Sequence, residues 1–107
     1  MRISRSDRRI AARHNYKAPV RFQIWKSPTP RQVATAENLS EGGIFFATDS
    51  ELRVGTVIEV CVSMPEEITG EPAREWICSG HVVRVEPIQS PDGMVGVGVQ
   101  FDCYEVA

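Results

Sequence analysis

The chain has 107 residues, of which 42% are apolar and 24% charged, so it corresponds to one compact domain and is not disordered throughout. No apolar run approaches the roughly 18 residues that a membrane span needs, and no hydrophobic stretch follows the basic first residues. We therefore expect no membrane insertion, no secretory signal and a cytoplasmic location.

The net charge of −2 is unevenly distributed. Residues 1–26 contain eight Lys or Arg and one acidic residue, whereas residues 27–107 contain four basic and thirteen acidic residues. This asymmetry favours a front segment that meets a small anion. We expect no DNA or RNA partner, because the acidic remainder would repel a long phosphate backbone.

Residues 1–17 form a basic arm that we expect to be flexible until a ligand organises it, because they have few apolar side chains and no strand alternation. The arm contains Arg8, Arg9 and Arg13. Their planar guanidinium groups suit paired contacts with phosphate oxygens or a guanine edge, and they also stack on purines. A solvated basic tail is the alternative interpretation.

The rest of the sequence consists of short strand-like segments separated by turn residues. In the first segment, Val20, Phe22 and Ile24 lie on one face, and Arg21, Gln23 and Trp25 lie on the other. The predicted strands are 18–25, 31–39, 44–47, 56–64, 75–86 and 94–101, with a polar hairpin loop at 65–74. Five or six strands without a long helical period predict a small all-β antiparallel barrel over residues 18–102, followed by a short tail at 103–107.

Three glycines inside the predicted strands have specific expected roles. Gly80 marks a bulge in the segment 75–86. Gly96 and Gly98 lie on one face of the last strand, where something packs closely or the strand bends.

The cysteines and histidines do not form a recognisable reactive centre. Cys61, Cys78 and Cys103 are far apart and lack C-x-x-C spacing, which argues against a disulfide framework or a zinc site. His14 and His81 have no partner visible in the sequence. We expect no metal, no catalytic residue and no enzymatic activity.

The segment from Asn38 to Gly43 (N-L-S-E-G-G) is a second candidate for ligand contact. Asn38 offers a donor and an acceptor, Ser40 can donate to a phosphate oxygen, and glycine permits close approach of the backbone. The alternative is an ordinary turn, in which Asn and Ser bond their own backbone and glycine supplies the bend.

The two motifs in order, R-x-x-x-R at Arg9 and Arg13 and N-x-S-x-x-G at Asn38, Ser40 and Gly43, resemble the PilZ domain family. The resemblance covers roughly residues 8–102 and includes the segments 52–56, 80–85 and 98–101. PilZ domains are receptors for the bacterial second messenger cyclic di-GMP. The resemblance implies a single domain over residues 1–107, built as a six-stranded antiparallel barrel of Greek-key or split type.

The resemblance also implies a role for each motif residue. Arg9 and Arg13 would grip phosphates and guanine edges, Asn38 and Ser40 would contact guanine and nearby groups, and Gly43 with Gly42 would permit the loop shape. Arg8, just before the first motif, favours two cyclic di-GMP molecules per chain. Family members commonly end in a C-terminal helix, which we expect to be short or absent here.

The sequence therefore predicts a cyclic di-GMP receptor with no other cofactor, which signals to an unidentified effector protein when the arm closes on the ligand. Two alternatives remain open. One is a PilZ-like adaptor that binds protein and not nucleotide. The other is a small barrel that binds single-stranded nucleic acid through the basic arm.

Overall fold

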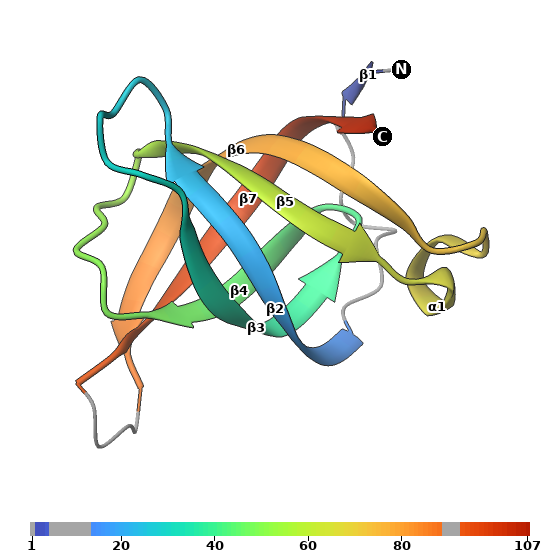
Figure 1. The fold of residues 1–107 in the computed structure, drawn as a ribbon. Helices are drawn as coiled ribbons and strands as arrows, with labels where there is room; N and C mark the ends of the chain where they lie inside the picture. The colour runs from blue at the N-terminus through green and yellow to red at the C-terminus, as the bar shows by residue number, and fades with distance from the viewer. Residues whose placement is uncertain (1, 5–13, 89–92) are drawn as a thin grey trace.

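The protein forms a closed antiparallel β-barrel in the computed structural model, which describes residues 2–4, 14–88 and 93–107 (Figure 1). The barrel strands are β2 (His14–Ile24), β3 (Gln32–Ser40), β4 (Gly43–Thr48), β5 (Val57–Met64), β6 (Arg74–Pro87) and β7 (Val95–Val106). A short strand, β1 (Arg2–Ser4), lies beside the end of β7, and one helical turn, α1 (Glu66–Thr69), lies between β5 and β6. The predicted all-β barrel of six strands is confirmed.

Two three-stranded meanders close the barrel on each other. The first runs through β2, β3 and β4, and the second through β5, β6 and β7. Pairing of β2 with β5 joins them on one side, and pairing of β4 with β7 joins them on the other. Closure gives each of these six strands two neighbours, so the barrel leaves no long edge for another chain to extend.

The core is built from side chains that alternate along the strands. Phe22, Phe46 and Phe101 are fully buried, and the rings of Phe22 and Phe46 pack with centroids 5.0 Å apart. Trp76 and Tyr104 are also buried and stack with centroids 3.8 Å apart. The inner face is therefore filled by large apolar side chains, and a polar ligand site has to lie on the outside.

The expected bulge at Gly80 is confirmed. The pairing between β6 and β7 shifts register between Ser79 and Gly80. A Cβ atom at position 80 would lie 2.1 Å from the backbone oxygen of Gln100, so the close approach of the two strands requires glycine there.

The structure differs most from the sequence-based boundaries at two strand ends and in the expected flexible arm. Residues 2–4 of that arm form β1 and pair with residues 103–105 of β7. β2 begins at His14, four residues before the predicted strand. β7 continues to Val106, five residues beyond Phe101, because β6 pairs with it as far as Trp76 opposite Val106. The residues expected to form a tail at 103–107 are therefore almost all part of a strand. No helix in the described part of the chain is long and apolar enough to cross a membrane.

Candidate functional site

Strand register assembles the site from two neighbouring rows of residues on the outer face of the barrel. The first row runs across β6, β7, β4 and β3 and consists of Arg84, Gly98, Phe45 and Asn38. The second row runs across β7, β4 and β3 and consists of Gln100, Gly43 and Ser40. Leu39, Ile44 and Val99 lie between the rows and are buried in the core. Alternation along each strand therefore turns both rows outward.

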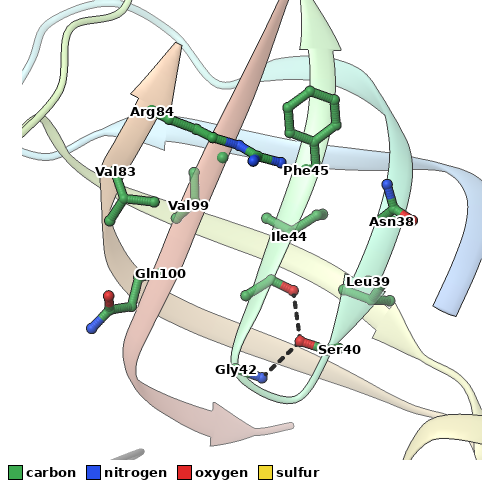
Figure 2. A pocket seen from close by; sticks show the side chains of 12 residues that line it. Asn38, Leu39, Ser40, Gly42, Ile44, Phe45, Val83, Arg84, Val99 and Gln100 are labelled. Atoms are coloured by element: carbon green, nitrogen blue, oxygen red, sulfur yellow. Dashed lines mark hydrogen bonds between the residues drawn. The ribbon is translucent and has the colours of Figure 1, made fainter. Parts of the chain in front are cut away.

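These rows surround an open hollow of about 230 Å³ (Figure 2). All four residues predicted from the second motif line it: Asn38, Ser40, Gly42 and Gly43. In Figure 2, Arg84 extends across β7 from one side, while the turn from Ser40 to Gly43 closes the lower end. The structure thus places the motif residues of the β3–β4 turn around one space, with an arginine that belongs to neither motif.

Ser40 organises the turn between β3 and β4. Its hydroxyl oxygen accepts a hydrogen bond from the backbone N–H of Gly42 at 3.1 Å and donates to the carbonyl oxygen of Gly43 at 3.5 Å. These are the backbone contacts that the ordinary-turn interpretation predicted for Ser40. Because the donated bond is at the long limit, the hydroxyl proton can turn to a ligand oxygen while the bond from Gly42 remains.

Backbone packing requires glycine at position 43, and a backbone hydrogen bond holds Gly42 against β7. A Cβ atom at position 43 would lie 2.4 Å from the carbonyl oxygen of Val99, on the neighbouring strand β7. The carbonyl oxygen of Gly42 accepts a hydrogen bond from the N–H of Phe101 at 2.9 Å. Close contact with β7 thus holds the turn in place and leaves the edge of the hollow free of side chains there.

Asn38 lies on β3 at the end of the first row and is half-buried. Its side-chain amide makes no hydrogen bond with another residue of the described chain and borders the hollow. An amide with an unused donor and acceptor can pair with the edge of a nucleobase.

Arg84 is the residue at this site that motif analysis missed. Its guanidinium carbon lies 4.9 Å from the centroid of the Phe45 ring, and its Nε lies 3.8 Å from a carboxylate oxygen of Glu86. The expected close packing at the two glycines of β7 is confirmed, with Phe45 over Gly96 and Arg84 over Gly98. The spacing of the two glycines predicted a close contact, but only the folded structure shows that Phe45 and Arg84 make it.

Arg8, Arg9 and Arg13 lie outside the described residues. The described chain resumes at His14, which pairs with Leu39, and Asn15 pairs with Asn38. β2 therefore begins beside the strand that carries Asn38 and Ser40.

Outside the hollow, the three cysteines are buried, and His81 is paired with a neighbouring carboxylate. Burial raises the pKa of the Cys78 thiol, and the nearby Cys61 and Cys103 thiols add to the effect. Burial also raises the pKa of Cys61, an effect that the charge of Arg31 opposes. A nitrogen of His81 lies 2.9 Å from a carboxylate oxygen of Asp102. Within the described residues, no group of three or more His, Cys, Asp or Glu side chains is arranged to hold a metal ion.

The PilZ domain family model matches residues 5–105 of the chain. The chain belongs to the PilZ domain family. This family comprises receptors and adaptors for cyclic di-GMP, and PilZ domains are binding modules and not enzymes. The resemblance found in the sequence is thereby confirmed.

Two solved structures share the fold of this PilZ domain. The Bacillus subtilis inhibitor of motility, MotI/DgrA, superimposes with a TM-score of 0.67 at 20% identity, over 95% of this chain and 45% of that chain. The PilZ domain of CeSA from a cellulose-synthesizing bacterium superimposes with a TM-score of 0.53 at 19% identity, over 83% of this chain and 79% of that one. The chain thus spans less than half of the MotI/DgrA chain. No curated protein matches it significantly.

Proposed function

We propose that this PilZ domain is a cytoplasmic receptor that binds cyclic di-GMP in the hollow over β3, β4, β7 and β6. The observation that carries the proposal is the placement of Asn38 and Ser40 around one outward-facing hollow, next to the point where β2 begins. Arg13 directly precedes His14, the first residue of β2, in the sequence. The second motif and the entry of the arm are thus on the same side of the barrel.

The chemistry of cyclic di-GMP matches the groups that this proposal brings together. The ligand is a dianion with two guanine bases, and Arg9 and Arg13 supply charged forks for its phosphates and guanine edges. Asn38 pairs with a base edge, and Ser40 donates to a ligand oxygen. Gly42 and Gly43 keep side chains away from the bound nucleotide. Arg8 would contact a second cyclic di-GMP, giving two molecules per chain.

Signal output in this proposal comes from closing the segment between β1 and β2, which contains Arg8, Arg9 and Arg13, over the ligand. Closure would bring up to three arginines onto the outer surface of the barrel and would cover the hollow. An effector protein that recognises this surface in one state only would then report the concentration of the nucleotide.

Isothermal titration of the purified protein with cyclic di-GMP tests the proposal, with cyclic GMP as the ligand control. Each charge-assisted contact contributes about 1.5–3 kcal/mol, so Arg13→Ala should weaken binding about 10- to 150-fold. Arg53→Ala is the matched control, because Arg53 is exposed and does not line the hollow. The molar ratio distinguishes one nucleotide from two.

The contacts of Ser40 favour one alternative, the PilZ-like adaptor that binds no nucleotide. The Ser40 hydroxyl is already bonded at both Gly42 and Gly43, as a purely structural turn requires. Absence of heat with cyclic di-GMP from a folded sample would support this alternative and contradict the proposal. Strongly salt-dependent binding to oligonucleotides would instead support the nucleic-acid-binding barrel.

A further inference from the structure

Arg84 is held against the barrel surface by a specific arrangement of small and large residues. Gly98 lies between Arg84 and Phe45 in the first row, so the two side chains meet above it. A Cβ atom at position 98 would lie 2.9 Å from Cγ and 3.1 Å from Nε of Arg84. The aliphatic part of the arginine therefore lies directly on the backbone of β7.

The Phe45 ring packs in the same way on Gly96, two residues before Gly98 on β7. A Cβ atom at position 96 would lie 2.2 Å from Cζ of the Phe45 ring. Neither Gly96 nor Gly98 has a positive φ, so the backbone conformation itself does not call for glycine. Glycine inside a strand is less favourable than alanine, because it loses more conformational freedom on folding. What these two positions gain in return is the space that lets Phe45 and Arg84 lie against β7, with 4.9 Å between the guanidinium carbon and the ring centroid.

Within the described chain, the guanidinium of Arg84 has one weak polar partner. This is an ion pair with Glu86, in which the nitrogen–oxygen distance is 3.8 Å and both side chains are about half exposed. Pairs of this kind contribute little. The group is thus fixed through the Phe45 ring and Gly98, while it still borders the hollow.

We infer that Arg84 and Phe45 form a preorganised stacking site for a purine base, in which the base lies on the guanidinium face and extends the stack begun by Phe45. The inference rests on the proposed function of the hollow. A planar cation is a good partner for a purine ring. Two strand spacings separate Gly98 from Asn38, about 10 Å, so a base stacked on Arg84 lies within reach of the Asn38 amide.

Four variants titrated with cyclic di-GMP test this inference. Arg84→Ala should weaken binding about 5- to 150-fold, which is the range for loss of one base-stacking contact. Arg84→Lys should lose nearly as much, because lysine keeps the charge but has no planar group to stack. Arg53→Ala, which removes an exposed arginine outside the hollow, should leave the affinity unchanged. Gly98→Ala should weaken binding about 3- to 10-fold by displacing Arg84 from its seat.

A double-mutant cycle tests whether Gly98 affects nucleotide binding by positioning Arg84 or by a general effect on the barrel. If Gly98 acts through Arg84, the variant Gly98→Ala with Arg84→Ala should bind no more weakly than Arg84→Ala alone. Thermal unfolding of each variant shows whether the fold is retained, and we expect it to be, because the added methyl group meets a flexible side chain.

The outcomes distinguish this inference from the proposed function. Wild-type affinity in Arg84→Ala, or full affinity in Arg84→Lys, overturns the stacking site while leaving the receptor proposal intact. Additive losses in the cycle overturn the positioning role of Gly98. If the folded wild-type protein does not bind cyclic di-GMP at all, both proposals are overturned.

Discussion

The barrel carries two hollows on its outer surface, and they differ in the residues that β6 and β7 contribute. The first is the proposed nucleotide site, to which β7 supplies Gly98 and Gln100. The second is larger, about 420 Å³, and is lined by Trp25, Val57, Ile58, Glu59, Ile77, Ser79, Cys103, Tyr104 and Glu105. At the first hollow, Gly96 and Gly98 of β7 leave space in which Phe45 and Arg84 lie across the strand. The second hollow has no glycine among its described lining residues, and β6 and β7 contribute Ile77, Ser79, Cys103, Tyr104 and Glu105 to it.

This difference teaches that the outer face of one barrel can be specialised locally by side-chain size. Both hollows share the same core and the same pair of strands, β6 and β7. A change that acts on the backbone of β7 should therefore affect the first hollow, whereas a change at the rim of the second should leave nucleotide binding alone.

The largest expected effect follows from Gly43→Ala. The new methyl group would lie 2.4 Å from the carbonyl oxygen of Val99, so β4 and β7 must separate locally. Forcing extra volume into a packed site costs about 1–3 kcal/mol, and the first hollow should lose most of its affinity for cyclic di-GMP. Urea unfolding and titration calorimetry measure the two effects.

Gly70→Ala is the control for loss of stability without damage to the hollow. Gly70 caps α1 with φ of 79° and has open space around its Cβ position, so alanine there introduces backbone strain of about 1–2 kcal/mol. Binding should remain at the wild-type level in this variant. Equal loss of binding in Gly43→Ala and Gly70→Ala would show that the comparison of the two hollows reflects stability only.

A pH dependence is expected from the interior that both hollows share. Burial raises the pKa of Cys78 above the value of about 9 that the thiol has in the unfolded chain. The neutral thiol is thus favoured by folding. Its contribution to stability is fully present below pH 9 and is lost as the pH rises further, by up to about 1.4 kcal/mol per pH unit.

Urea unfolding at pH 7, 9 and 10 measures this dependence. Cys78→Ala is the matched variant, and its free energy of unfolding should fall less steeply above pH 9 than that of the wild type. Parallel pH profiles for the two proteins would contradict the assignment to Cys78.

The smallest effect is expected for Trp25→Ala. Trp25 is 59% exposed at the rim of the second hollow, so its removal should change the free energy of unfolding by about 0.5 kcal/mol or less. The affinity for cyclic di-GMP should stay within a factor of two of wild type in the same titration. A large loss of nucleotide binding would show that the two hollows do not act separately.

Much of the fold could be predicted from local sequence patterns. The alternation of Val20, Phe22 and Ile24 identified β2, and turn residues separated the other strands. The extent of β7 beyond Phe101 could not be predicted this way, because it depends on pairing with β6, which is far away in the sequence. The polar residues Asp102 and Glu105 also weaken the pattern there.

The candidate site was predicted only in part for a related reason. The motif residues Asn38, Ser40, Gly42 and Gly43 were identified from sequence, and the structure places them around one hollow. The arginines of the first motif lie outside the described residues, so their roles stay predictions. Arg84 and Gln100 lie in segments that share the family resemblance, but neither they nor Phe45 were identified as site residues.

The sequence by itself determined the approximate positions of the six barrel strands, the alternating faces of β2 and the two motifs, because alternation and turn chemistry act over a few neighbouring residues. Only the tertiary structure decided that Arg84 meets Phe45 above Gly98 and that Asn38 ends the same row. Those contacts depend on which residues face each other across hydrogen-bonded strands. A shift of one residue in that register would turn the whole row into the core, and no local pattern specifies it fully.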